Sequence, residues 1–485
     1  MSTPRARRHS RWGLLDALRQ RPGILLSRST TMGRAVPPST LTRSERAIMK
    51  RTAPSSLAAR VKRLASHQPS SWATIGRDAR PNLHGLLRYP AMMIPSMQGD
   101  ILDVVLAEID GPCRVTDPFV GSGTVMTEAL IRGLDFVGID INPLAALVCE
   151  AKIAVDAGAD VEHGVEVVLH HLARDAKMTV DVDFAGRAKW FSRESAIYFS
   201  KIRRAIMRVE DAGTRKVLWV AFADTIRRCS NSRTSTYKLH VRPDAEMVDV
   251  SRIREVFFST LREALQRTSA YQQILAHSRR KTPKARIICG DVRTAKIPVS
   301  RTRHQILVTS PPYGDNVTTI PYGQFSFLAL NWIDPQDLPD GVDDALLANT
   351  HALDAASLGG SVLDAQEKHA EMVEISPMYK RFSRQAKRDK RDIRKVSCFM
   401  YDYWEALHRM DSKALGSAHW VMTTGNRNAA GLKVPFDAIN RDIVEALGGR
   451  CVTSIQRKLP VKRMPNRNSI GELINAETTL VAEFV

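Results

Sequence analysis

Long apolar runs and paired cysteines are both missing from this 485-residue sequence. No stretch approaches the roughly 20 apolar residues that a membrane-spanning helix needs, so we do not expect a membrane protein. The six cysteines lie far apart without a C-x-x-C pair, which favours buried thiols over a disulfide framework or a metal site. The apolar segment 13–18 is interrupted by Asp16 and is too short for a secretory signal. We therefore expect a cytoplasmic protein.

Acidic residues are scarce as well. The chain has 51 Asp and Glu against 71 Lys and Arg, which gives a net charge of +20. Such an excess favours a polyanionic partner, most simply nucleic acid. Residues 1–51 hold 12 of the basic residues against two acidic ones, so about half of the charge lies there. We predict a basic, disordered arm over residues 1–60, although a transit peptide has a similar composition.

A glycine-rich stretch organises the first half of the chain: Asp117-Pro118-Phe119-Val120-Gly121-Ser122-Gly123-Thr124. It follows a short apolar run and opens a helical segment at 125–132. The glycines permit close approach to the backbone, and a helix N-terminus offers unpaired N–H groups. A turn of this kind can hold a nucleotide-like ligand, or it can serve packing alone.

An acidic residue, Asp140, ends an apolar strand about twenty residues beyond these glycines. A carboxylate at this position can accept hydrogen bonds from both hydroxyls of a ribose. The alternative is that Asp140 caps the next helix, a role that Asn142 could fill equally well.

The second motif is Ser310-Pro311-Pro312-Tyr313, which follows a predicted strand at 305–309. Two successive prolines fix the backbone and hold its carbonyl groups in place. The Ser310 hydroxyl and the Pro311 carbonyl can then accept hydrogen bonds from an amine, and Tyr313 offers a flat face for a base. A rigid turn without chemistry is the alternative.

In this order the two motifs resemble the paired signatures of the S-adenosylmethionine-dependent DNA amino-methyltransferases, which methylate cytosine N4 or adenine N6. The resemblance covers roughly residues 84–150 and 285–485. It implies an α/β, Rossmann-like class I methyltransferase fold: a mainly parallel, seven-stranded sheet flanked by helices. It also implies S-adenosylmethionine as cofactor, double-stranded DNA with a flipped base as substrate, no metal and, by analogy, a cognate restriction endonuclease as partner.

The resemblance assigns roles to individual residues. Tyr89 and Pro90 match a "YPA-x-x-x-P" segment that walls the methionine end of the cofactor, and Asp291 lies where the family contacts the adenine amino group. A serine at position 310 favours cytosine N4 over adenine N6. The catalytic residues would be Ser310, Pro311, Pro312 and Tyr313, and the cofactor-binding residues Tyr89, Pro90, Asp117, Phe119, Gly121, Ser122, Gly123, Thr124, Asp140 and Asp291.

Between the two motifs, helical spacing over residues 151–284 predicts a mainly helical insertion and a possible DNA-recognition subdomain. The methyltransferase domain would then comprise residues 61–150 and 285–485. Three basic segments could contact phosphates: a loop at 227–238, a run at 376–395 and a turn at 457–463. Ordinary solvated surfaces are the alternative for each.

Two other functions stay open from the sequence. An RNA amino-methyltransferase carries related tetrapeptides, usually with Asp or Asn at the first position. A non-catalytic DNA-binding protein could keep the same fold, although it would be free to lose Ser310–Tyr313 and Asp117–Thr124.

Overall fold

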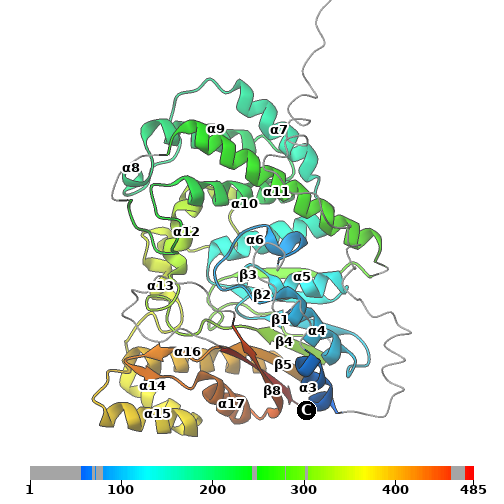
Figure 1. Ribbon diagram of the computed structural model, residues 1–485, viewed down its shortest axis with the longest axis vertical. Helices are drawn as coiled ribbons and strands as arrows, with labels where there is room; N and C mark the ends of the chain where they lie inside the picture. The colour runs from blue at the N-terminus through cyan, green and yellow to red at the C-terminus, as the bar shows by residue number, and fades with distance from the viewer. Residues whose placement is uncertain are drawn as a thin grey trace, which may run out of the picture.

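A seven-stranded sheet lies at the centre of the protein, with the strand order β3-β2-β1-β4-β5-β9-β8 (Figure 1). The computed structural model describes residues 56–67, 72, 80–242, 248–278, 280–300, 304–414, 416–459 and 476–484. The first five strands are parallel, whereas β9 is antiparallel to both of its neighbours. The strands are β1 (Cys113–Asp117), β2 (Asp135–Asp140), β3 (Ala285–Cys289), β4 (His304–Thr309), β5 (Ser417–Thr424), β8 (Arg450–Lys458) and β9 (Ala476–Phe484).

Helices cover both faces of this sheet, because alternate residues of its strands enter different cores. In β4, Ile306 and Val308 pack in one core and Leu307 in the other. The first core is closed by α3 (Leu57–His67), α4 (Pro95–Leu106) and α5 (Thr124–Ile131), and the second by α14 (Ala365–Ile375), α15 (Pro377–Arg388), α16 (Arg394–Asp411) and α17 (Phe436–Ala446). The predicted Rossmann-like fold is therefore confirmed.

The chain between β2 and β3 is helical, as expected for the insertion. It forms α6 (Pro143–Asp156), α7 (Val161–Arg174), α8 (Arg187–Trp190), α9 (Arg193–Ile206), α10 (Ala212–Cys229) and α11 (Val250–Ala276). These helices share a core of their own, in which Phe222 and Phe257 meet edge to face. The predicted junction at 150/151 lies inside α6, and the division into domains by residue range stays a prediction.

The insertion is fastened to the segment that follows the second motif. Helix α12 (Tyr322–Trp332) contributes Trp332 to the insertion core, where it packs on Phe191 and Phe199. Beyond α12, Arg203 pairs with Asp334 at 2.6 Å. Figure 1 shows α12 between the upper helices and the sheet. Shorter elements are η2 (Asn82–Gly85), η3 (Pro335–Asp337), η4 (Asp344–Leu347), α13 (Ala352–Ala356) and a small hairpin of β6 (Asn428–Ala429) and β7 (Leu432–Lys433).

The structure bears on three expectations from the sequence: the state of the cysteines, the membrane-spanning helices and the basic terminal segments. All six cysteines are free thiols, and five are buried. Among the described residues, no helix is both long and apolar enough to span a membrane. The predicted basic arm lies almost wholly outside the described residues, as do residues 460–463 of the turn predicted at 457–463, whereas Arg457 and Lys458 belong to β8.

Candidate active site

The two motifs meet at the carboxyl ends of β1 and β4. These strands are neighbours, and the strand order reverses between them, which is where open α/β sheets bind their ligands. The Thr309 hydroxyl donates a 2.6 Å hydrogen bond to Asp117 Oδ1, so the last residue of β4 is tied to the last residue of β1. The same oxygen accepts from the backbone N–H of Phe119 at 3.1 Å. The glycine-rich loop and the Ser-Pro-Pro-Tyr loop therefore begin at two residues that are hydrogen-bonded to each other, Asp117 and Thr309.

Two glycines give the first loop its path. Gly121 and Gly123 have φ of +51° and +76°, a region that other residues enter at a cost, and Gly123 is the N-cap of α5. Two side chains of α6 hold the loop carbonyls: the Cys149 thiol donates to Gly121 O, and Lys152 Nζ donates to Ser122 O at 2.6 Å. The carbonyls of Gly121 and Ser122 are thus held by α6, and the loop leads directly into the first turn of α5.

Asp140 joins the loop to the end of β2. Its Oδ2 accepts from the Gly121 N–H and its Oδ1 from the Asn142 N–H, both at 2.8 Å. The helix-capping role goes to Asn142, whose side chain accepts from Leu144 N at the start of α6. A carboxylate has about four acceptor sites, so two remain for a ligand. Burial raises the pKa of Asp140 to about 6.

Tyr89 covers the glycine loop from the side of the preceding segment. Its hydroxyl accepts a 2.8 Å hydrogen bond from Asn142 Nδ2, which also donates to Ser326 in α12. The Tyr89 ring stacks on Tyr322, with centroids 5.6 Å apart. A Cβ at Gly121 would lie 3.7 Å from this ring. The predicted "YPA" segment, with Pro90 also buried, therefore lies beside the loop and is joined through Asn142 to the helix after the second motif.

The second loop is held through Tyr313. The Ser310 hydroxyl lies 3.3 Å from the Tyr313 hydroxyl, which donates to Glu477 Oε1 of β9 at 3.0 Å. Arg457 of β8 donates to the other oxygen of Glu477. Pro311 is buried, whereas Ser310 and Tyr313 keep part of their surface exposed.

Directly after the tetrapeptide, Asp315 is fully buried and pairs with Arg427 at 3.1 Å. Gly314 has a φ of +152°, and a Cβ there would lie 2.2 Å from the Arg427 guanidinium, so a larger residue would strain the backbone and displace Arg427. The Ser-Pro-Pro-Tyr loop is consequently anchored on both sides, by β9 through Tyr313 and by the loop after β5 through Asp315.

The remaining predicted cofactor residues are placed as follows. Ser122 and Thr124 are buried in the loop and at the start of α5, and Phe119 lies 6.2 Å from Tyr403 of α16, ring to ring. Asp291 follows β3 at the same edge of the sheet. Both of its carboxylate oxygens accept from the Arg293 guanidinium, so its acceptors are already shared with a cation.

One electrostatic feature of the site is unusual. The Asp117 carboxylate is fully buried, and its Oδ2 has no hydrogen-bond partner among the described residues. Burial raises the pKa of Asp117 to about 7. A buried carboxyl with an unused oxygen is costly, and such groups concentrate where a ligand supplies the missing partner. Within the described part of the chain, no cluster of three or more His, Cys, Asp or Glu could hold a metal ion.

Sequence reasoning missed several residues of this arrangement. Cys149 and Lys152 grip the glycine loop, and Glu477, Arg457 and Arg427 hold the second loop. The sequence around most of these residues is typical of a helix, strand or loop and does not indicate a functional residue. Two features had a signal in the sequence: a lysine within the apolar segment of α6, and a glutamate in the apolar strand β9.

Comparison with known proteins agrees with this geometry. The chain is 28% identical over 414 residues to the type II methyltransferase M.MvaI of Kocuria varians, covering 82% of this chain and 88% of the relative. A shorter match, 30% identical over 77 residues, joins 16% of the chain to 14% of the type II methyltransferase M.MjaII of Methanocaldococcus jannaschii. No family model matches the chain.

The sheet order, the glycine loop after β1 and the proline-rich loop after β4 define a Rossmann-like methyltransferase. The similarity to M.MvaI extends over most of both chains, and together with the paired motifs it supports an enzyme of the DNA methyltransferase class. These relatives imply a methyl donor as cofactor and DNA as substrate.

Proposed function

We propose that the protein transfers a methyl group from S-adenosylmethionine to an exocyclic amino group of a base flipped out of double-stranded DNA. The observation that carries this proposal is the 2.6 Å hydrogen bond between Thr309 and Asp117, which fixes a nucleotide-type loop beside Ser310–Tyr313. Amine and methyl group must be aligned for transfer, and two loops that start from one point supply such alignment.

The residues at the first loop fit the proposed donor. Asp140 has two acceptor sites left for the ribose hydroxyls, and the unpartnered oxygen of Asp117 suits the ammonium group of the methionine end. Gly121 lets the donor approach the backbone next to Tyr89. When bound, the donor supplies a methyl group already activated by its sulfonium.

The second loop would act on the amine. An exocyclic amine is a weak nucleophile because its lone pair is delocalised into the ring, and acceptors around its protons favour the tetrahedral form that attacks. Ser310 Oγ and the Pro311 carbonyl are suited to that role, and the Tyr313 ring offers a face for the extruded base. The serine at position 310 leads us to favour cytosine N4 over adenine N6.

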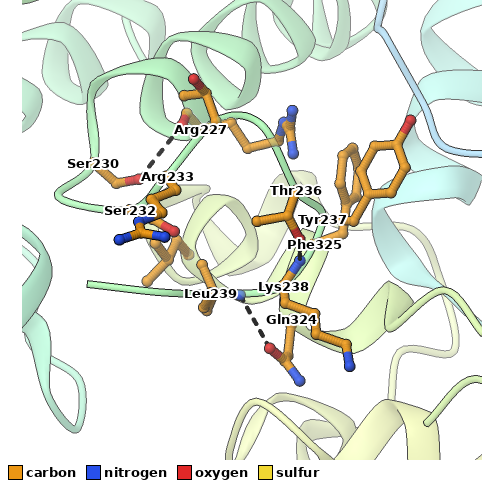
Figure 2. Close-up of a pocket in the computed structure, with 12 residues that line it drawn as sticks. Arg227, Ser230, Ser232, Arg233, Thr236, Tyr237, Lys238, Leu239, Gln324 and Phe325 are labelled. Carbon is orange, nitrogen blue, oxygen red and sulfur yellow. Dashed lines mark hydrogen bonds between the residues drawn. The ribbon is translucent and has the colours of Figure 1, made fainter. Parts of the chain in front are cut away.

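The basic segment predicted as a loop at 227–238 is a suitable surface for the DNA backbone; residues 227–229 form the last turn of α10, and the loop begins after them. It lies against α12: Leu239 N donates to Gln324 at 3.0 Å, and Arg227 lies 4.2 Å above the Phe325 ring (Figure 2). Phe325 in turn meets Tyr89 edge to face, so this loop adjoins the donor side of the site. Arg233 and Lys238 are exposed and available for phosphates.

A second basic surface lies on the other side of the Ser-Pro-Pro-Tyr loop. Helix α15 buries Tyr379, Phe382 and Ala386 and exposes Arg381, Arg384, Lys387 and Arg388. After this helix, Lys395 Nζ lies 3.8 Å from Asp315, directly beyond the tetrapeptide. We propose that DNA lies across the loop ends between these two surfaces, with its phosphates on both.

The central test is methyl transfer from labelled S-adenosylmethionine to duplex DNA and, in parallel, to total RNA. Label in DNA, lost in Pro311→Ala and retained in Pro335→Ala, supports the proposal. Digestion to nucleosides then separates cytosine N4 from adenine N6. Label in RNA alone would move the assignment to the RNA enzymes. Absence of label with DNA binding retained would indicate a non-catalytic DNA-binding protein.

The DNA surfaces can be tested separately through the salt dependence of binding, since each phosphate contact contributes about one unit to the slope of log K against log salt. We expect Arg233→Ala/Lys238→Ala and Arg384→Ala/Arg388→Ala each to reduce the slope. The control is the double variant Arg174→Ala/Lys177→Ala, because both residues are exposed, Arg174 at the end of α7 and Lys177 just after it. This variant should leave the slope unchanged. A slope unaffected by the first two variants would contradict the assignment. A cytoplasmic location and a cognate restriction endonuclease complete the proposal.

A further inference from the structure

A chain of hydrogen bonds leads from the proposed catalytic serine into the last two strands of the sheet. Ser310 contacts Tyr313 at 3.3 Å, and Tyr313 contacts Glu477 at 3.0 Å. Glu477 and Arg457 are directly opposite each other in the β8–β9 ladder and form an ion pair, with the Arg457 side chain 10% exposed. The loop and the strand pair are thus connected by polar contacts through one tyrosine.

The Glu477 carboxylate determines where the protons lie in this series of hydrogen bonds. An ionised carboxylate accepts hydrogen bonds and donates none, so the Tyr313 hydroxyl must donate its proton to Glu477. The Tyr313 oxygen can then only accept from Ser310. The Ser310 proton consequently points towards Tyr313, and the lone pairs of Ser310 Oγ point elsewhere.

We propose that Glu477, through Tyr313, fixes the Ser310 hydroxyl as a hydrogen-bond acceptor for the amino group of the substrate base. Glu477 is therefore a positioning residue: it touches Tyr313 and acts on the substrate through Ser310. Arg457 pairs with Glu477 and holds its carboxylate in place. This inference rests on the proposed function, since it assumes that Ser310 faces the amine.

Glu477→Gln hardly changes the shape of the side chain, but it reverses the direction of the hydrogen bonds that join residues 477, 313 and 310. The amide oxygen of glutamine would accept from Arg457, and its NH₂ group would donate to Tyr313. Tyr313 would then donate to Ser310, and the serine proton would point towards the amine. We expect kcat for methyl transfer to fall by about 10- to 100-fold, less than the roughly 10²- to 10³-fold cost of removing a transition-state hydrogen bond outright, with the KM for S-adenosylmethionine unchanged.

The matched control is Glu483→Gln. Glu483 lies on the same strand, faces Arg450 in the same ladder and forms the equivalent ion pair away from the site. We expect it to retain the wild-type kcat. If Glu477→Gln keeps the wild-type rate, or if both variants lose it equally, the inference is wrong.

A double-mutant cycle separates positioning from a general structural effect. Tyr313→Phe removes the hydroxyl through which Glu477 acts, so adding Glu477→Gln to it should cost no further activity. An equal loss from Glu477→Gln in both backgrounds would overturn the inference.

If the wild type methylates neither DNA nor RNA, the proposed function fails, but the hydrogen bonds from Ser310 through Tyr313 to Glu477 can still be tested by the NMR chemical shift of labelled Tyr313 Cζ. A shift that changes in Glu477→Gln but not in Glu483→Gln supports these hydrogen bonds, and an unchanged shift contradicts them.

Discussion

Lys152 Nζ lies 2.6 Å from the carbonyl oxygen of Ser122, so a buried cation of α6 holds the glycine-rich loop from below. The lysine side chain is almost fully buried, with 1% of its surface exposed, and burial lowers its pKa to about 8. The cofactor loop is therefore fastened by a group that loses charge within an accessible pH range.

This pKa gives a prediction for stability. A lysine whose pKa is lower in the folded than in the unfolded protein destabilises the fold while it is charged, and the penalty is relieved as pH rises from about 8 to 10.5. Lys152→Met removes this dependence. Between pH 7 and 10.5, urea denaturation should show the wild type gaining about 3 kcal/mol relative to the variant. A constant difference across this range would refute the charged, buried state.

Asp140 predicts how donor binding depends on pH. Its carboxylate must be ionised to accept from both ribose hydroxyls, and its pKa is about 6. The affinity for S-adenosylmethionine should be level above about pH 7, decline as Asp117 takes up a proton, and fall more steeply below about pH 6, by up to about tenfold per pH unit for each carboxylate. Asp140→Asn should weaken binding about 10- to 100-fold at pH 8 and leave only the decline that Asp117 causes. Calorimetric titrations from pH 5 to 8 would reveal either result, and an Asp140→Asn variant with the same acidic decline as the wild type would rule the role out.

Gly123 predicts a steric effect. Its φ is +76°, and an added Cβ would lie 2.9 Å from Cys149 Sγ and 3.0 Å from Met126 Cε. Gly123→Ala should cost about 2–4 kcal/mol of unfolding free energy, from left-handed strain and overpacking together. Gly158→Ala is the control, because its φ is +97° and no described residue lies within 4 Å of the added Cβ. Adding Cys149→Ala to Gly123→Ala should recover part of the loss, and no recovery would show that crowding by the thiol is not the cause.

Gly314 allows a similar comparison at the second loop. Gly314 and Gly290 have φ of +152° and +156°, so backbone strain is common to both, but only Gly314 faces the Arg427 guanidinium. Gly314→Ala should displace Arg427 from the buried Asp315 and cost about 1–3 kcal/mol more than Gly290→Ala in chemical denaturation. Equal losses in the two variants would show that the ion pair tolerates the shift.

The parts of the site that the sequence predicted are those whose signal is local. Asp117, the two glycines and Asp140 each mark the end of a strand or a tight turn, so position along the chain implied position in space. The strand patterns of residues 451–456 and 478–485 likewise predict an antiparallel pair, and β8 and β9 confirm it.

The parts that it did not predict depend on pairs that are distant in sequence. Asn142 bonds to Tyr89 across 53 residues, and Tyr313 to Glu477 across 164. No periodicity joins such positions, because the contact exists only after the sheet has set the register of its strands. Likewise, the sequence does not show whether Asp140 or Asn142 caps α6, because the choice depends on the backbone geometry after β2; in the structure Asn142 is the cap.

The position of β9 between β5 and β8 also bears on how the protein is made. During synthesis, β5 and β8 leave the ribosome before the strand that joins them, so a growing chain has two unpaired edges and two unfinished cores. Glu477 reaches Tyr313 only when this strand is inserted. A chain interrupted before residue 476 would therefore contain both motifs in full and still lack the contact that orients the second.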